Sequence, residues 1–151
     1  MIEQPRESWT RALVAVPEAR LAALVNDLAS AWQIRPLTLP QAGLGMLKLR
    51  DSAFNDPFYL GEFPLACCAI RVTTESGATV EGAAQVMDDR LDRVEQLALC
   101  DAILAGRLPG WRQLYALLQE GERLLEQTRI ERKAMLARTR VDFSLLDDVG
   151  G

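Results

Sequence analysis

The sequence of 151 residues contains no histidine. Histidine is the commonest general base, the usual partner of a serine or cysteine nucleophile, and the commonest metal ligand. Lysine is nearly absent as well, because Lys48 and Lys133 are the only two. Catalysis by carboxylates, lysine or arginine is still open, but these absences make the chain a weaker candidate than most for a self-contained enzyme.

Cysteine is scarce, and two of the three residues, Cys67 and Cys68, are adjacent. Adjacent residues of a strand point to opposite faces, so these two thiols cannot bind one ion together. We expect both of them, and Cys100, to be small buried hydrophobic residues. No cluster has the spacing of a zinc or iron–sulfur site, and we expect no metal. So few thiols make a poor disulfide framework and indicate a reducing cytoplasm.

Long hydrophobic runs are missing too. No run approaches the roughly 18 residues that span a bilayer, and residues 1–11 lack the apolar segment of a secretory signal. Hydrophobic residues make up 49% and charged residues 25% of the chain, which are ordinary values for a globular protein. The net charge is −4, and basic residues are not interleaved with aromatic ones, which disfavours nucleic-acid binding. The length fits a single domain over residues 1–151.

The first part of the chain, residues 1–33, has a helical pattern. Ser8 is placed to cap a short helix that Pro17 ends. Pro17 also suits the first position of a second helix, where its missing N–H costs nothing. Apolar residues then recur at three- and four-residue spacing, which predicts an amphipathic helix. These residues are Leu21, Leu24, Val25, Leu28 and Trp32.

The next part, residues 34–87, has the pattern of an antiparallel sheet. Two prolines and alternating leucines predict an edge strand over Ile34–Pro40. Gln41–Gly43 has the composition of a turn, and Leu44–Arg50 follows as the second strand of a hairpin. Long extended runs over Phe58–Thr74 and Ala78–Met87 complete the set. The sequence therefore predicts four strands in an antiparallel meander.

Residues 88–140 are predicted to be helical again. Asp88 and Asp89 are placed to cap a helix that continues to Gly106 and is apolar nearly all round in its second half. A long helix follows from Trp111 to about Arg138, and residues 141–151 form an extended, acidic tail. The predicted fold class is α+β, with one layer of four antiparallel strands covered by helices.

Few residues stand out as candidates for chemistry or binding. Asp101 falls on an otherwise apolar helix, so its carboxylate needs a donor such as Arg71 or a backbone N–H, or else contacts a partner. The basic stretch 129–140 suits either a solvated helix face or a partner. The Gly61–Glu62 step suggests a backbone conformation open only to glycine, so we expect Gly61→Val to damage folding or assembly.

Four short blocks follow one another in a fixed order. They are Met46–Glu62, the strand pair Cys68–Val72 with Val80–Ala84, the helical block Glu95–Ala102, and Thr139–Phe143. Together they resemble the PhnG family, the small G subunits of the bacterial carbon–phosphorus lyase system. The first block ends like the family's F-x-L-G-E motif, the third is like its helical A-E-x-x-A-x-x-D-A run, and the fourth is like its terminal T-R-V-D-F block.

The chain departs from the family pattern before the third block. Asp88-Asp89-Arg90 stands where the family usually has G-R-D, Arg93 replaces a common histidine, and Val94 replaces the usual alanine.

The resemblance implies a cytoplasmic complex for phosphonate breakdown. In it the I subunit, helped by H and L, uses ATP and an alkylphosphonate to form α-D-ribose 1-methylphosphonate 5-triphosphate with release of adenine. The J subunit is a radical enzyme that later cleaves the C–P bond. The G subunit is an obligatory partner without an assigned catalytic residue. We therefore expect an accessory chain with no catalytic residue and no cofactor of its own, although the complex uses ATP.

The expected partners are the I subunit first, then H and J, and L for the transferase step. Neither nucleic acid nor membrane is expected as a partner, and the isolated chain could form a homo-oligomer. The candidate interface residues are Tyr59, Leu60, Gly61, Glu62, Arg71, Asp101, Arg138, Thr139, Arg140, Val141, Asp142 and Phe143.

Two other functions are compatible with the residues alone. One is a self-contained small-molecule enzyme that uses Glu62, Asp101 and Arg71 around a pocket between sheet and helices. The other is a homodimeric binding module with an apolar groove.

Overall fold

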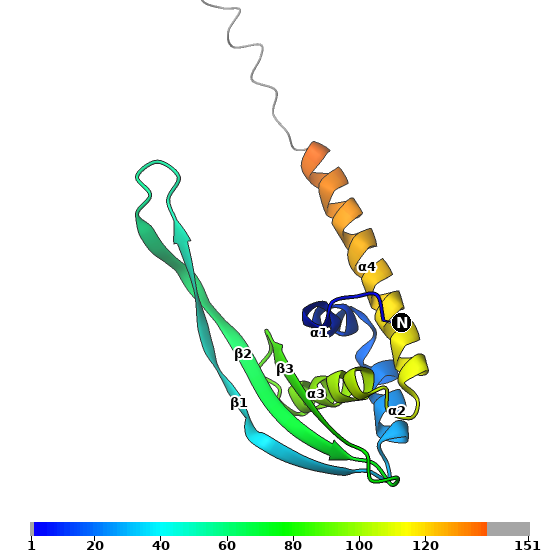
Figure 1. Ribbon diagram of the computed structural model, residues 1–151. Helices are drawn as coiled ribbons and strands as arrows, with labels where there is room; N and C mark the ends of the chain where they lie inside the picture. Colours follow the sequence, from blue (N-terminus) through cyan, green and yellow to red (C-terminus); the bar gives the residue numbers. More distant parts are fainter. Residues whose placement is uncertain (1, 139–151) are drawn as a thin grey trace, which may run out of the picture.

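The structure, a computed structural model, describes residues 2–138. A three-stranded antiparallel sheet lies against four helices (Figure 1). The strand order is β1-β2-β3, so β2 is central and both outer strands are edges. The helices are α1 (Arg6–Ala15), α2 (Glu18–Leu28), α3 (Leu91–Gly106) and α4 (Trp111–Arg138); the strands are β1 (Gln33–Arg50), β2 (Pro57–Thr73) and β3 (Thr79–Val86).

The α+β class is correct, but the expectation of four strands is wrong. Ile34–Pro40 and Leu44–Arg50 belong to one continuous strand, β1, which pairs antiparallel with β2. The segment Gln41–Gly43 was expected to turn, yet it stays extended and pairs with Leu65–Cys67. Register shifts on either side of Thr38 accommodate the prolines, so β1 bends without leaving the sheet.

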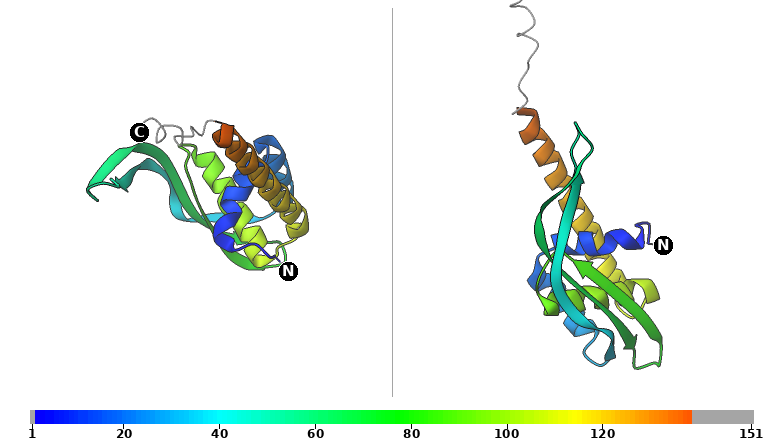
Figure 2. Two further views of the ribbon diagram at one scale, coloured as in Figure 1. Left: turned by 90° about the horizontal axis from the view of Figure 1, so that it is seen from above. Right: turned by 90° about the vertical axis from the view of Figure 1, so that its left-hand side faces the viewer.

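The β1–β2 pair extends far beyond the third strand. β3 pairs with β2 only from Ala66 to Thr73, whereas β1 and β2 stay paired as far as Arg50 and Pro57. Figures 1 and 2 show the two long strands leaving the body as a curved ribbon. We call residues 42–65 of this pair the distal ribbon.

Helix α3 lies at the centre of the core, between the sheet and the other helices. Its residues from Leu97 to Leu104 are all buried. The sheet approaches α3 closely at Gly82, where an added Cβ would come within 2.2 Å of the carbonyl oxygen of Ala98. None of the buried hydrophobic residues in the described part of the chain comes from β1. The body of the protein is therefore α1–α4 packed on β2 and β3.

Helix α4 matches its predicted span and continues past the body. Its first half is anchored by the buried side chains of Leu114, Leu117 and Leu118. At Gly121 the helix passes so close to α1 that an added Cβ would lie 2.0 Å from the Ala12 carbonyl oxygen. No residue after Gly121 in the described part of α4 is fully buried.

Two of the expected helix caps are wrong. The N-cap of α1 is Pro5, and the hydroxyl of Ser8 donates to the Pro5 carbonyl oxygen at 2.8 Å. The N-cap of α3 is Arg90, whose N–H is bound by the carboxylate of Asp88 at 3.0 Å. Asp88 therefore closes the turn that leads into the helix.

Candidate interaction surface

The distal ribbon carries a dense set of exposed hydrophobic side chains. No described helix covers it, and within the strands only Gly45, Phe63 and Leu65 are even half-buried. The exposed fraction reaches 69% at Leu44 and 63% at Leu60. Isolated exposed leucines are normal on protein surfaces, but a contiguous set marks an interaction site. The other exposed members are Met46, Leu47, Leu49, Phe54, Phe58 and Tyr59.

The four residues predicted from the F-x-L-G-E block lie together on this ribbon. The ammonium of Lys48 lies 5.9 Å from the centre of the Tyr59 ring. Leu60 is the extra residue of a bulge, because Leu47 pairs with Gly61 and Lys48 pairs with Tyr59. Glu62 follows in the ladder, opposite Met46.

The expectation of a glycine-only conformation at Gly61 is wrong. Gly61 has no positive φ, and a Cβ placed on it would meet nothing within 4 Å. The close approach is at Gly45, where an added Cβ would lie 2.5 Å from the ring of Phe63 on the facing strand. The ring covers Gly45, so a side chain at this position would have to displace the ring of Phe63.

The tip of the ribbon is closed by one carboxylate. Asp51 accepts hydrogen bonds from the N–H groups of Ala53 at 3.0 Å and Phe54 at 2.8 Å. These two bonds hold the pKa of Asp51 below its usual value. Asn55 takes a left-handed conformation with φ of 57°, which asparagine tolerates. The turn holds Phe54 outward, with 81% of its surface exposed.

The end of α4 is a second exposed surface. Ile130, Met135 and Leu136 are exposed on it, and the guanidinium of Arg129 forms an ion pair with Glu126 at 2.7 Å. Arg138, a predicted interface residue, is exposed in the last turn. The other predicted residues of this region, Thr139, Arg140, Val141, Asp142 and Phe143, lie outside the described residues. Figures 1 and 2 show α4 and the ribbon leaving the body on the same side.

Asp101 is bound inside the body. Its carboxylate receives Arg6 of α1 through Nε at 2.8 Å and Nη2 at 2.6 Å, and the N–H of Ala83 at 2.9 Å. Only 9% of the Asp101 side chain is exposed. The predicted backbone donor is confirmed, and the predicted donor Arg71 is wrong. Arg6 also reaches the Glu81 carbonyl oxygen at 3.5 Å, so the pair occupies hydrogen-bonding groups of edge strand β3.

The three residues of the hypothetical carboxylate enzyme are not brought together. Arg71 is exposed and pairs with Glu81 at 2.6 Å on the neighbouring strand. Asp101 is buried between α3, α1 and β3, and Glu62 lies on the distal ribbon. This geometry contradicts a shared pocket for the three side chains.

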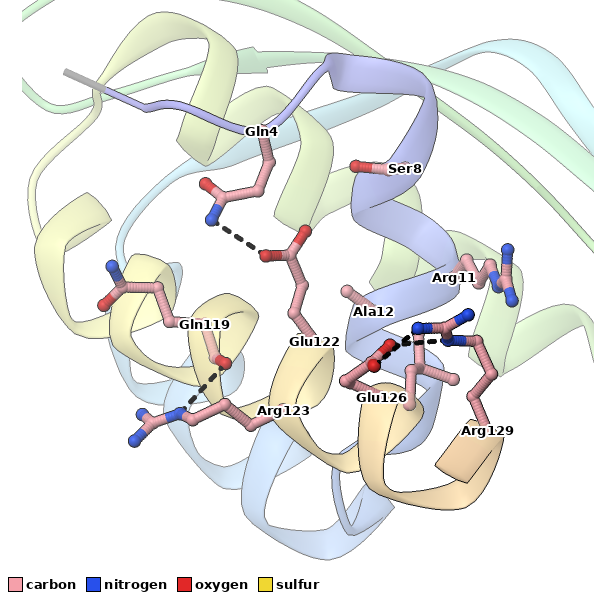
Figure 3. Close-up of a pocket in the computed structure, with 10 residues that line it drawn as sticks. Gln4, Ser8, Arg11, Ala12, Gln119, Glu122, Arg123, Glu126 and Arg129 are labelled. Carbon is pink, nitrogen blue, oxygen red and sulfur yellow. Dashed lines mark hydrogen bonds and ion pairs between the residues drawn. The ribbon is translucent and has the colours of Figure 1, made fainter. Parts of the chain in front are cut away.

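A depression of about 840 Å³ lies between α1 and α4 (Figure 3). Several of its polar groups are bound within the chain: Arg129 binds Glu126, Gln4 donates to Glu122 at 2.9 Å, and Arg123 donates to the Gln119 carbonyl oxygen. The pairing with Arg129 lowers the pKa of Glu126. Ser8, the hydroxyl that lines it, donates to the Pro5 carbonyl oxygen. The residues lining this depression therefore contain no nucleophile paired with a base.

A second depression of about 480 Å³ lies between α2, α3 and the sheet. Val25, Ile34, Ile70 and Leu99 give it apolar walls, and Glu95 is among the acidic residues that line it. The other two acidic residues, Glu18 and Asp92, both form ion pairs with Arg90. This shape suits an apolar group better than a reactive one.

The cysteines are partly as expected. Cys67 and Cys68 do face opposite ways, since Cys67 is exposed and Cys68 is buried. The expectation that Cys67 is buried is therefore wrong. Burial raises the pKa of the Cys68 thiol to about 11 and raises that of buried Cys100 as well. Across residues 2–138, no three histidine, cysteine or acidic side chains are grouped as metal ligands would be.

The sequence was compared with models of known protein families. The sequence model described as "Phosphonate metabolism protein PhnG" matches residues 4–147. The chain belongs to the PhnG family. Membership means a role in phosphonate metabolism as a subunit of the carbon–phosphorus lyase complex. No curated protein matches the sequence in a direct search, and none of the described helices has both the length and the hydrophobicity of a membrane span.

The PhnG-like blocks occupy distinct places in this fold. The F-x-L-G-E block lies in the β2 strand of the distal ribbon, the strand pair is the centre of the β2–β3 ladder, and the helical block overlaps the buried part of α3. Two of the residues that depart from the family pattern near the start of α3 make contacts within the chain. Arg93, which replaces the family's histidine, binds Glu18 of α2 at 2.6 Å, and Val94 is fully buried.

Sequence reasoning missed part of this surface. Leu44, Met46 and Leu47 were not among the candidate interface residues, although they are among the exposed apolar side chains of the ribbon. The signal that could have identified them is the near absence of polar alternation between Gly43 and Leu47. The role of Arg6 had no such signal, because its partner Asp101 is 95 residues away.

Proposed function

We propose that this chain is an accessory, non-catalytic subunit of the carbon–phosphorus lyase complex. In this role it supports the ATP-dependent formation of α-D-ribose 1-methylphosphonate 5-triphosphate with release of adenine, in the cytoplasm. Its first partner is the I subunit, with H and J in the same assembly and L joining for the transferase step. The chain binds no cofactor itself.

The observation that carries this proposal is the exposed apolar ribbon in a member of the PhnG family. The ribbon holds the F-x-L-G-E block and contributes nothing to the body's core. A large exposed apolar surface promotes aggregation of a free protein, whereas in a complex it is buried against a partner. Both carboxylates that line the larger depression are bound within the chain, Glu122 by Gln4 and Glu126 by Arg129, which supports an accessory role.

Assembly is tested by co-expressing the chain with its I, H and J subunits, with an affinity tag on I. We expect the chain to be retained with the tagged I subunit in a stoichiometric complex, and to be absent from the tag-only control. A chain that remains monomeric and is not retained would contradict the proposal.

The accessory role is tested by adenine release from ATP and methylphosphonate, after L is added to the assembled complex. Three arginines line the larger depression, and Arg11→Ala on α1 and Arg129→Ala on α4 change two of them (Figure 3). We expect both variants to assemble and to keep kcat within about twofold. A fall of about a hundredfold in kcat with assembly intact, about 2.7 kcal/mol in barrier height, would instead assign catalysis to this chain.

The carboxylate enzyme makes the opposite prediction, because it requires turnover by the isolated chain that Glu62→Gln abolishes. The separation of Glu62, Asp101 and Arg71 disfavours it.

A further inference from the structure

The distal ribbon has two faces, and neither is covered by any described element of the chain. The face that continues the buried side of β2, which we call the helix-side face, carries Leu44 opposite Pro64 and Met46 opposite Glu62. The opposite side, the outer face, carries Leu47, Phe63 and Leu65. Near the tip β1 has no extra residue, so its alternation puts Lys48 with Tyr59 on the helix-side face and Leu49 with Phe58 on the outer face.

Both faces carry exposed apolar side chains, and the outer face carries no charged residue, which is unusual for a ribbon in water. An antiparallel pair with one solvated face alternates hydrophobic and polar side chains, whereas strands covered on both sides are hydrophobic throughout. Here the outer face of the distal strands has no charged residue, and the helix-side face has only Lys48, Arg50 and Glu62. A two-stranded ribbon is at best marginally stable alone, so this composition indicates a ribbon covered on both sides in the functional state.

The exposed surface is also larger than a compact chain of this size requires. The protein exposes 10577 Å². If residues 1 and 139–151 contributed the full surface of an unfolded chain, about 2,200 Å², the rest would still expose about 8,400 Å², against about 7,100 Å² for a compact protein of that mass. The excess of about 1,300 Å² exceeds the roughly 800 Å² that each partner contributes to a standard interface.

A second copy of the chain does not meet this requirement. A two-fold contact uses the same patch on both copies, so ribbon against ribbon covers one face of each and leaves the other face in water. The ends of α4, on the same side of the body, add to the difficulty. Residues 126–138 hold four basic and two acidic residues, so two such ends brought together would repel each other.

We propose that the distal ribbon is inserted into a partner chain of the carbon–phosphorus lyase complex, which covers the helix-side and outer faces together. This inference rests on the proposed function. The partner supplies apolar side chains on both sides of the ribbon and an acidic surface toward the end of α4. The ribbon is thus an insertion arm whose two faces contribute to the same interface.

The test uses one lysine substitution on each face, in the complex assembled with the tagged I subunit. Leu44→Lys changes the helix-side face and Leu47→Lys changes the outer face; both side chains are exposed, at 69% and 44%, so the body should keep its fold. Met87→Lys, at a side chain 68% exposed outside the ribbon, is the matched control. Circular dichroism and the thermal midpoint verify the fold of each variant.

We expect each ribbon variant to weaken retention at least about tenfold, because a buried ammonium without a partner is costly, and Met87→Lys to leave retention unchanged. Full retention of either ribbon variant, with the wild type retained, overturns the two-faced insertion and leaves the proposed function standing. Failure to retain the wild type overturns both. A stable dimer of the isolated chain in analytical ultracentrifugation, abolished by both substitutions, assigns the ribbon to a second copy and overturns the inference.

Discussion

At the scale of single residues, Asp101 protects a free edge of the sheet. Edge strand β3 presents N–H and C=O groups with no neighbouring strand, which is a hazard for uncontrolled strand pairing. The carboxylate of Asp101 takes the Ala83 N–H, and Arg6 reaches the Glu81 carbonyl oxygen. The side chains of Asp101 and Arg6 therefore bind backbone groups of β3 that a fourth strand would otherwise bind.

Asp101→Ala is expected to destabilise the protein by about 2–4 kcal/mol. The substitution leaves the Ala83 N–H and the Arg6 guanidinium without their main acceptor, and unsatisfied groups of this kind are costly. Urea unfolding measures the change. The control is Glu81→Ala, which breaks the exposed pair with Arg71 and should cost less than about 1 kcal/mol. Equal losses in the two variants would show that Asp101 is an ordinary surface partner.

The three thiols are expected to react very differently at pH 8. The pKa of Cys68, raised to about 11 by burial, leaves only about one thiolate in a thousand at that pH, and Cys100 is fully buried. Cys67 is exposed. Titration with Ellman's reagent should find one fast thiol in the native chain and three after denaturation. Cys67→Ser should remove the fast one; if it remains, the burial of the other two is wrong.

At the scale of elements, close packing between α1 and α4 depends on Gly121. A Cβ there would approach the carbonyl oxygen of Ala12 to 2.0 Å, and a backbone cannot move aside cheaply. Gly121→Ala should therefore destabilise the protein by about 1–3 kcal/mol, measured by urea unfolding. Gly61→Ala is the matched control, because its Cβ would meet open space, and its stability should change by less than about 1 kcal/mol. A destabilised Gly61 variant would restore the special backbone role first predicted for that residue.

The elements differed in how far the sequence determined them. The long helix was predictable because its apolar spacing is continuous from Leu114 and its ends are marked by Gly110 and the polar terminal stretch. The strand count was not, because Gln41–Gly43 has the composition of a turn and yet pairs within β1. Local composition cannot distinguish a turn from a bulged, extended segment when the deciding contact is with the facing strand.

The sequence allowed us to predict one stretch of the candidate surface, but not the full set of residues that form it or their exposure on both faces of the ribbon. The F-x-L-G-E block drew attention to Tyr59–Glu62, and the structure adds β1 residues such as Leu44 and Met46 to the same ribbon. The sequence could not indicate that β3 ends at Val86, opposite Ala66, or that the buried residues of β2 begin only at Ala66. It therefore could not show that both faces of the distal ribbon are uncovered.

At the scale of the whole molecule, the body should fold without its arm. Among the described residues, none between 30 and 65 is a buried hydrophobic residue. A variant in which Asn-Gly replaces residues 46–62 joins the facing pair Gly45 and Phe63 by a tight turn. We expect cooperative urea unfolding with a free energy within about 1 kcal/mol of wild type, and loss of retention by the complex. An unfolded or insoluble variant would show that the ribbon stabilises the body.

The contacts of α1 also constrain when the protein can fold during its synthesis. Arg6 needs Asp101, which is made 95 residues later, and Ala12 packs against Gly121 of α4. At about 5–20 residues per second, the first helix leaves the ribosome roughly 5–20 seconds before its partners exist. During that interval the apolar strands of the ribbon and then β3 are made, and the edge of β3 has no cap until Asp101 of α3 follows. The nascent chain is therefore at its most vulnerable after β3 is made and before α3 is complete, which makes synthesis alongside its partner subunits, or the help of a chaperone, an advantage that follows from the order of its elements.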